Sequence, residues 1–283
     1  MTEYPLIAGV ELGGTKCICI LANSPDRIID EKRIETTDPQ TTLTSIDAVL
    51  EQWSGGHDFA AVGIASFGPL DFATSEIVRT TKPGWSGAKL GECFRRWGVP
   101  IALDTDVNGA AMAEGRWGAA KGLADFTYIT VGTGVGVGSI VGGIPVRGLA
   151  HSEAGHLRIP RLPGDTWSGN CSFHGDCVEG LASGPAIAAR GEENWDAVTH
   201  ALAMLLHNLV LTTAPRRILV GGGVPNAEPQ ILPKIRERME SSLAGFGHSA
   251  LIAYDPDFVT APALGARAGP LGAIALGLAA IGG

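Results

Sequence analysis

The chain has no excess of positive charge and no segment built like a secretory signal or a membrane span. Its net charge is −8, from 21 Lys and Arg against 29 Asp and Glu, which disfavours nucleic acid as a partner. The run from Met1 to Pro5 lacks the basic and apolar regions of a signal peptide. The most apolar segment, residues 271–283, is too short and too glycine-rich to cross a bilayer. We therefore expect a cytoplasmic protein without nucleic-acid or membrane partners.

Cysteines are few and odd in number. Two of the five, Cys17 and Cys19, alternate on an apolar, strand-like run, and this pattern favours buried thiols over a disulfide. Cys93 lies in an amphipathic stretch and has the same interpretation. The usage is typical of a reducing compartment.

Glycine, by contrast, is abundant. The 40 glycines cluster in pairs and triplets beside apolar runs, which indicates tight turns where backbone approaches a ligand. Because the overall charge is negative, small anions must be held by local backbone amides and helix ends.

Apolar periodicity predicts an α/β protein in which one arrangement occurs twice. A strand, a glycine turn and a second strand appear near residues 6–22 and again near residues 126–141, each followed by a strand that enters a glycine turn and a helix. This repeat of architecture predicts two related α/β lobes with a cleft between them. The strands are expected at residues 6–11, 17–22, 27–35, 59–65, 99–103, 126–131, 135–141, around 145–146 and at 217–220, and the helices at 43–53, 90–97, 107–117, 185–190, 195–212, 229–243 and 264–280.

The two glycine turns are candidate anion sites. Gly13-Gly14-Thr15-Lys16 offers backbone amides, a hydroxyl and a positive charge, and Gly132-Thr133-Gly134 lies at the equivalent place in the second half. Each alone could be an ordinary hairpin turn. Together they could clamp a nucleoside triphosphate from both sides.

A strand gives way to a helix at Asp104-Thr105-Asp106-Val107-Asn108. Asp106 could serve only as the N-cap of that helix. Alternatively, a carboxylate at a helix start stays ionised and can act as a general base, taking a proton from an alcohol that attacks phosphorus. Asn108 would then orient either the substrate or the start of the helix.

A Cys/His cluster predicts a metal site. His156, Cys171, His174 and Cys177 have the ligand types and short spacing of a tetrahedral zinc site, and four protein ligands favour a structural over a catalytic ion. The alternative is four unrelated buried residues. Glu153, His156 and Glu179 could bind several hydroxyls of a sugar, with the two ring nitrogens of His156 serving different partners.

A strand also runs into the triplet Gly221-Gly222-Gly223, where a flat group such as adenine could lie against backbone. Ser183-Gly184-Pro185, at a helix start, could line the same pocket. The series Gly134-x-Gly136-x-Gly138 is not interpreted as a dinucleotide fingerprint, because the helix and the acidic residue that should follow are missing.

Taken together, these motifs resemble the ROK family of sugar kinases, within the actin-like ATPase folds, over nearly the whole chain. Most of that family carries Cys-x-Cys-Gly-x-x-Gly-Cys-x-Glu, whereas this chain has Cys171-x-x-His174-Gly175-Asp176-Cys177-x-Glu179. This variant is similar to the bacterial zinc-containing fructokinase branch, as are Lys82-Pro83-Gly84-Trp85 and Ser183-Gly184-Pro185. Further markers are Glu114-Gly115 after Asp106 and Asn108.

The resemblance implies an ATP-dependent hexose kinase with Mg²⁺ and a structural Zn²⁺, organised as a homodimer. It implies an amino-terminal lobe of residues 1–112 completed by residues 266–283, and a carboxy-terminal lobe of residues 113–265. It implies Asp106 as the base; the implied sugar ligands are Gly68, Thr105, Asp106, Glu153, His156 and Glu179. The implied nucleotide contacts are Gly13, Gly14, Thr15, Lys16, Gly132, Thr133, Gly134, Ser183, Gly184, Pro185, Gly221, Gly222 and Gly223, and the implied zinc ligands are His156, Cys171, His174 and Cys177.

Two departures from the family pattern bear on the substrate. Glu11 stands where most members have Asp before the Gly-Gly-Thr turn, which changes the expected coordination of magnesium-bound water. Thr105 stands where glucose-specific members usually have Asn, which argues against a strict glucokinase. The expectation is therefore D-fructose to D-fructose 6-phosphate. The alternatives are a broad hexokinase acting on mannose, glucose or an N-acetylhexosamine, and a non-catalytic sugar sensor.

Overall fold

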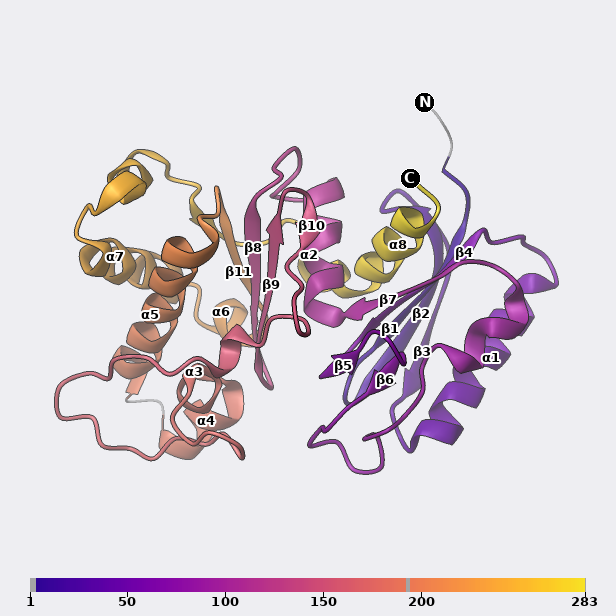
Figure 1. The fold of residues 1–283 in the computed structure, drawn as a ribbon, viewed down its shortest axis with the longest axis horizontal. Helices are drawn as coiled ribbons and strands as arrows, with labels where there is room; N and C mark the ends of the chain where they lie inside the picture. Colours follow the sequence, from indigo (N-terminus) through magenta and orange to yellow (C-terminus); the bar gives the residue numbers. More distant parts are fainter. Residues whose placement is uncertain (1–3, 192–193, 283) are drawn as a thin grey trace. The chain divides into compact units, whose positions relative to one another are not determined.

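A computed structural model describes residues 4–191 and 194–282. The first three residues of the segment considered above for a secretory signal lie outside this range. The described chain divides into two compact units (Figure 1). Unit 1 consists of residues 4–121, 147–151 and 264–282, and unit 2 of the described residues in 122–146 and 152–263.

Unit 1 is built on a five-stranded mixed sheet with the order β3-β2-β1-β4-β7. The first three strands form an antiparallel meander, and β4 and β7 join β1 in parallel. The strands are β1 Ile7–Leu12, β2 Lys16–Ser24, β3 Arg27–Glu35, β4 Ala61–Ser66 and β7 Ile101–Thr105, and a small hairpin adds β5 Leu70–Asp71 and β6 Glu76–Ile77. Parallel addition places the carboxyl ends of β1, β4 and β7 along one edge, where Leu12, Ser66 and Thr105 end their strands.

The helices of unit 1 begin where the sequence supplies a cap. Asp38 accepts a hydrogen bond from the Thr41 amide at the start of α1 (Pro39–Ser54), and Pro39 fits the first turn because no hydrogen bond from its nitrogen is needed there. The stretch predicted as a helix over residues 90–97 is instead the 3-10 helix η1 (Glu92–Trp97), which Gly98 ends at a φ of 65°. Cys93 is half-buried there, whereas Cys17 and Cys19 are buried as expected. The other helices are α2 Asp106–Trp117, η5 Gly265–Arg267 and α8 Ala268–Ala280.

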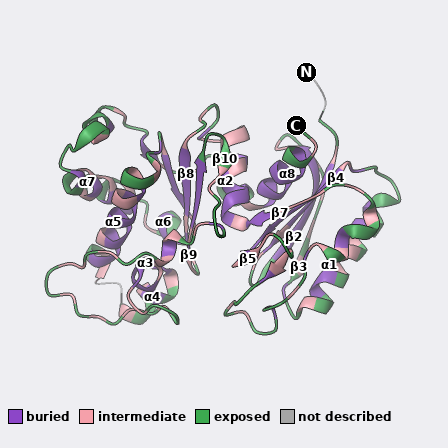
Figure 2. Cartoon of the chain, in the orientation of Figure 1, coloured by how far each residue is buried: buried purple, intermediate pink, exposed green. Residues whose placement is uncertain are grey.

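Glycines let α8 approach the sheet and α2 at backbone distance. A Cβ on Gly63 of β4 would lie 1.9 Å from the carbonyl oxygen of Ala273, and a Cβ on Gly272 would lie 2.4 Å from the carbonyl carbon of Gly109 in α2. Any larger residue would force these elements apart. Helix α8 is accordingly buried along most of its length (Figure 2).

Unit 2 repeats the strand arrangement of unit 1. Its sheet has the order β10-β9-β8-β11-β12, with an antiparallel β8–β9 hairpin and with β11 and β12 joined in parallel. The expected duplication of architecture is therefore present in the fold. The elements are β8 Phe126–Val131, β9 Val135–Val141, β10 Ile144–Pro145, η2 Ala154–His156, α3 Val178–Ala182, α4 Gly184–Arg190, α5 Trp195–Thr213, β11 Ile218–Gly221, α6 Gly223–Ala227, α7 Ile231–Leu243, η4 Gly247–Tyr254 and β12 Val259–Thr260.

The boundary between the units falls after Lys121, nine residues beyond the expected division at 112/113. The physical reason is that α2 is one continuous helix that packs along α8, so a boundary within it would split a single packing surface. None of the helices in residues 4–191 and 194–282 combines the length and apolarity needed to span a bilayer.

Candidate active site

The first glycine turn joins β1 to β2 and is supported from beneath by one threonine. The Gly13 amide donates to the Lys16 carbonyl across the turn (3.1 Å). The Thr36 hydroxyl donates to the Gly13 carbonyl (2.7 Å), and the Thr36 amide donates to the Thr15 carbonyl (3.1 Å). The carbonyl oxygens of Gly13, Thr15 and Lys16 thus accept hydrogen bonds from within the protein. The residues Gly14, Thr15 and Lys16 are exposed. This is the arrangement that an anion-binding turn requires.

The Lys82-Pro83-Gly84-Trp85 motif supports the same turn through the segment after β3. The Lys82 ammonium donates to the Thr36 carbonyl (3.2 Å), and the Trp85 indole donates to the Thr37 carbonyl (2.8 Å). Trp85 is fully buried and meets the Phe67 ring edge-on at 5.3 Å. The motif therefore holds Thr36 in place, and Thr36 in turn supports the glycine turn through its hydrogen bond to the Gly13 carbonyl.

Two carboxylates, Glu11 and Asp106, lie near this turn in unit 1. The Glu11 side chain lies against the first turn of α8, where a Cβ on Gly269 would meet its Oε1 atom. Burial and then the negative charge of Asp106 raise the pKa of Glu11 to about 7, against a lowering effect of Lys16. Because the charges of Asp106 and Lys16 both act on the pKa of Glu11, the three side chains lie close enough to interact electrostatically.

Asp106 begins α2 but is not its N-cap. Thr105 holds that position, with extended backbone and a side chain that accepts from the Asn108 amide (3.2 Å). The alternative that Asp106 serves only as the N-cap is therefore wrong, because the preceding threonine satisfies the helix start. One Asp106 oxygen, Oδ1, accepts from the Val107 amide (2.8 Å) and orients the carboxylate at the end of β7.

Sequence reasoning missed a buried carboxylate two residues earlier. Asp104 is fully buried and accepts from the Thr105 amide (2.7 Å), the Asn108 side-chain amide (2.8 Å) and the Arg147 guanidinium (2.5 Å). Of the two roles considered for Asn108, the structure supports orientation of the helix start. No sequence spacing points to a partner as distant as Arg147.

The second glycine turn, in unit 2, is held by Glu179, a residue predicted to bind the sugar. The Gly132 amide donates to the Gly134 carbonyl (2.9 Å), and Thr133 is exposed at the tip. The Glu179 carboxylate, from the first turn of α3, accepts from the Val135 amide just after the turn (3.1 Å). A Cβ on Gly134 would lie 2.6 Å from Glu179 Oε2, so only glycine fits without moving the carboxylate.

The other residues of unit 2 that were predicted to bind the nucleotide lie around the same turn. The Gly184 amide, at the start of α4, donates to the Gly132 carbonyl (2.7 Å), and Ser183 caps that helix by accepting from the Ala186 amide (3.3 Å). Gly222, with a φ of 101°, approaches so closely that a Cβ there would lie 2.4 Å from the Val131 carbonyl oxygen. Pro185 is exposed beside Gly184, and Gly221 and Gly223 flank Gly222.

The four predicted metal ligands come together in unit 2. The Cys171 sulfur lies 3.6 Å from Nδ1 of His156 and 3.8 Å from Nδ1 of His174. The two Nδ1 atoms are 3.3 Å apart, and the Cys177 sulfur lies 3.5 Å from Nδ1 of His156. A tetrahedral zinc ion with bonds of about 2.3 Å to sulfur and about 2.0 Å to nitrogen separates its ligand atoms by roughly 3.3–3.8 Å. The alternative of four unrelated residues is wrong, because the four ligand atoms all lie within 4.8 Å of one another and could hold a metal ion.

The second ring nitrogen of His156 faces away from this cluster. His156 Nε2 lies 4.0 Å from Glu179 Oε1, too far for a direct hydrogen bond. Glu153 is exposed at the amino end of the same 3-10 turn, where its carbonyl accepts from the His156 amide (2.9 Å). His156 can therefore face a metal through Nδ1 and a polar ligand through Nε2.

An arginine–aspartate network, also missed from the sequence, supports the loop between His156 and Cys171. Asp165 accepts from Arg161 (3.2 Å) and Arg190 (2.6 Å), and Arg161 also donates to Asp176, next to Cys177 (3.1 Å). Burial alone would raise the pKa of Asp165, but hydrogen bonds from Arg190 and Arg161 lower it to about 2. The loop is thus held by charge pairs as well as by the cluster.

The candidate residues accordingly form one group in each unit. Unit 1 holds Gly13, Gly14, Thr15, Lys16, Gly68, Thr105 and Asp106, with Gly68 in the cis Gly68–Pro69 peptide that follows β4. Unit 2 holds Gly132, Thr133, Gly134, Glu153, His156, Cys171, His174, Cys177, Glu179, Ser183, Gly184, Pro185, Gly221, Gly222 and Gly223.

Known proteins resemble the chain in sequence and in structure. The chain is 37% identical to a fructokinase of Zymomonas mobilis over 96% of this chain and 96% of that enzyme. Its structure is similar to a ROK hexokinase from Thermus thermophilus, with a TM-score of 0.80 and 27% identity over 98% and 99% of the two chains. It is also similar to a ROK family glucokinase from Streptomyces griseus in complex with glucose and AMPPNP, with a TM-score of 0.76 and 26% identity over 96% and 99%.

These likenesses confirm the α/β, two-lobed actin-like ATPase fold expected from the sequence. The sequence profile of the ROK family matches residues 7–197, about two thirds of the chain. With the motifs and the duplicated sheets in place, the chain belongs to the ROK family.

Proposed function

We propose that this ROK-family sugar kinase transfers the γ-phosphoryl group of ATP to D-fructose, giving D-fructose 6-phosphate, with Asp106 as the general base. The observation that carries the proposal is the environment of Asp106. It starts α2 without serving as the N-cap, and it shares its surroundings with Glu11 and Lys16 beside an anion-binding turn. A carboxylate so placed can accept the hydroxyl proton as the phosphoryl group transfers in line.

ATP recognition is assigned to the glycine-rich elements. The exposed amides of Gly14 and Thr15, and those of the Gly132–Gly134 turn, would bind phosphate oxygens. The approach of Gly222 and α4 to the second turn supports adenine binding against backbone at Gly221–Gly223. Mg²⁺ bound with the nucleotide would offset the repulsion between the carboxylates of Glu11 and Asp106.

Sugar recognition is assigned to Glu153, His156 and Glu179, with Gly68, Thr105 and Asp106 contributing from unit 1. The 4.0 Å separation between His156 Nε2 and Glu179 Oε1 leaves room for a hydroxyl that accepts from the imidazole and donates to the carboxylate. We assign Zn²⁺ to His156, Cys171, His174 and Cys177. It would hold the loop from 156 to 177 and keep His156 Nδ1 occupied, so that the Nε2–H remains a donor.

We propose fructose as the acceptor for two reasons. The Zymomonas mobilis relative is named a fructokinase, and Thr105 lacks the amide expected of a glucose-specific enzyme. A broad-specificity hexokinase acting on mannose, glucose or an N-acetylhexosamine is the alternative, since one or two side chains decide between hexoses.

The test is a coupled ADP-release assay with ATP–Mg²⁺ and fructose, mannose, glucose and N-acetylhexosamines at equal concentration, with metal analysis of the same sample. We expect fructose to have the highest kcat/KM and about one zinc per chain. Preference for another hexose would retain the kinase and change its substrate. Sugar binding without turnover of any hexose would reject the proposal in favour of a sugar sensor.

A further inference from the structure

Residues 147–151 form a short segment that packs with unit 1, although residues 122–146 and 152–263 on either side belong to unit 2. We name residues 147–151 the strap. It ends two residues before Glu153, and its backbone is closed by a bridge between Arg147 and His151. Its two ends make polar contacts with different parts of unit 1.

At the first end, Arg147 binds the β7–α2 junction. Its guanidinium donates to the buried Asp104 carboxylate (2.5 Å) and lies 4.0 Å above the centre of the Phe72 ring. Asp104 also accepts from the Thr105 amide and from the Asn108 side chain. Arg147 therefore supplies the countercharge of a carboxylate that binds the backbone before Asp106 and the side chain of Asn108 after it.

At the second end, His151 binds the loop that follows β4. Its Nε2 atom accepts from the Leu70 amide (2.9 Å), and its ring meets Phe72 edge-on at 5.9 Å. His151 is buried, and a Cβ on Gly68 would lie 3.4 Å from Nε2, so the imidazole lies beside Gly68. An imidazole nitrogen that accepts this bond carries no proton.

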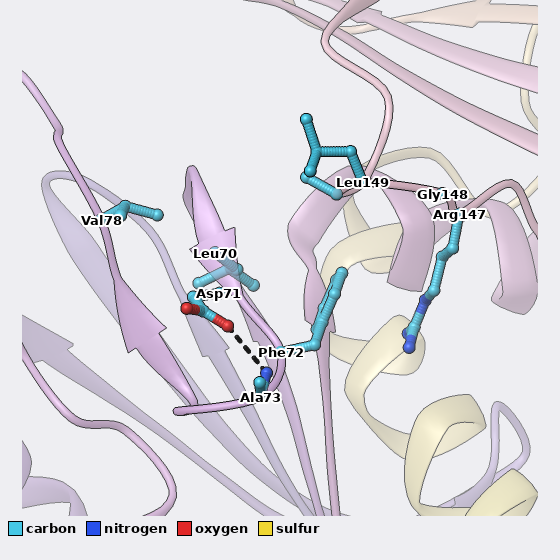
Figure 3. A pocket seen from close by; sticks show the side chains of 9 residues that line it. Leu70, Asp71, Phe72, Ala73, Val78, Arg147, Gly148 and Leu149 are labelled. Carbon is cyan, nitrogen blue, oxygen red and sulfur yellow. Dashed lines mark hydrogen bonds between the residues drawn. The ribbon is translucent and has the colours of Figure 1, made fainter.

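Between the two ends, the strap and the loop border a cavity of about 480 Å³, lined among others by Leu70, Phe72, Val78, Arg147 and Leu149 (Figure 3). Leu149 is fully exposed at the middle of the strap. Beside this cavity, the strap meets the loop at Arg147, whose guanidinium lies over the Phe72 ring, and at His151, which contacts Leu70 and Phe72.

We infer that the strap positions two parts of the active site separately: Arg147 sets the backbone that carries Asp106, and His151 sets the loop that carries Gly68. Both are positioning residues, because neither is placed against substrate. The inference rests on the proposed function, in which Asp106 is the base and Gly68 a sugar contact. It gives the two residues different kinetic signatures, one in kcat and the other in sugar KM.

The His151 arm compares two substitutions. His151→Phe keeps the ring beside Phe72 but removes the acceptor for the Leu70 amide, whereas His151→Gln offers a side-chain oxygen at a similar reach. We expect His151→Phe to raise sugar KM roughly 10-fold, as for loss of a partner to a buried amide, with kcat and ATP KM within about 2-fold of the parent. His151→Gln should recover most of the sugar KM. Equal effects of the two substitutions, or none, would overturn the assignment of His151.

The Arg147 arm uses Arg147→Met, which keeps much of the side-chain length, and Arg147→Lys, which keeps the charge. We expect Arg147→Met to lower kcat about 100-fold, since small displacements of a catalytic group cost that much, while sugar binding measured by calorimetry changes little. Arg147→Lys should recover part of kcat. A change confined to thermal stability, with kcat unchanged in folded Arg147→Met, would overturn the assignment.

The parent protein separates this inference from the proposed function. If the parent turns over no hexose, the proposed function fails, and the inference fails with it because there is no catalysis to position. If the parent is active and the kcat and KM effects do not divide between Arg147 and His151, the inference fails alone. Melting temperatures of all four variants identify any that are merely unfolded.

Discussion

The two glycine turns occupy equivalent places in two similar sheets, yet they are built differently. The turn at Gly13–Lys16 carries its own positive charge and has the carboxyl groups of Glu11 and Asp106 beside it, and its support is the uncharged Thr36. The turn at Gly132–Gly134 carries no charge and is locked against the Glu179 carboxylate and the start of α4. Under the proposed function, unit 1 provides the proton chemistry, while unit 2 holds ligands in fixed positions.

The largest effect expected from this comparison is at Asp106. Asp106→Asn keeps the size of the side chain and an oxygen for the Val107 amide but removes the base, so kcat should fall by about 1,000-fold or more. Sugar affinity, measured by calorimetry without ATP, should stay within a few-fold. Glu179→Gln is the matched change in unit 2 and should instead weaken sugar binding. Near-normal turnover by Asp106→Asn would contradict the proposal that unit 1 provides the proton chemistry and unit 2 the ligand binding.

The same added methyl group should act differently on the two turns. A Cβ at Gly134 would lie 2.6 Å from Glu179 Oε2, whereas a Cβ at Gly14 meets nothing within 4 Å. We expect Gly134→Ala to raise sugar KM about 10-fold or more, because displacing the carboxylate breaks its charge-assisted bond to the Val135 amide. Gly14→Ala, the control, should change sugar KM less than about 2-fold. Similar values for the two variants would show that Glu179 does not depend on the turn.

Metal removal should affect unit 2 selectively. Treating the protein with a chelator, or making Cys177→Ser, should lower the melting temperature and raise sugar KM before ATP KM changes, because the cluster holds His156. Cys93→Ser is the matched control, since Cys93 is half-buried and lies in unit 1. Unchanged sugar affinity in metal-free protein would remove the structural role given to zinc.

The smallest effect concerns pH and unit 1. The pKa of Glu11 in the folded protein is raised to about 7, so folding takes up a proton, and the stability this provides is lost as pH rises from about 4.5 to 7. Glu11→Gln should therefore raise the melting temperature above pH 7, by about 3 °C, and have little effect below pH 4.5. The measurement is a series of melting curves without Mg²⁺ or nucleotide. A pH-independent difference between variant and parent would contradict the stated cause.

Local sequence was sufficient for the longer strands, the longer helices, both turns and the Cys/His cluster, because each depends on periodicity or short spacing. It did not predict the two-residue strands β5, β6 and β12 or the five-residue helices α3 and α6, which are too short to show a period. It misplaced detail where neighbours compete for one role, as when Thr105 rather than Asp106 caps α2. It did not predict the hydrogen bonds between Arg147 and Asp104 or between Leu70 and His151, because the partners are 43 and 81 residues apart in the sequence. It also did not indicate that residues 147–151 would join unit 1, since no local pattern marks which sheet a connecting segment follows.

The close fit of α8 against Gly63 and Gly272 has a consequence for biosynthesis. The first sheet forms from residues that leave the ribosome early, but its covering helix begins only at Ala268. Until α8 emerges, the apolar face formed by Ile7, Ile20 and Ala61 has no cover, whereas every element of unit 2 is already available. The amino-terminal half of the nascent chain should therefore be the part that recruits chaperones, and it should finish folding last.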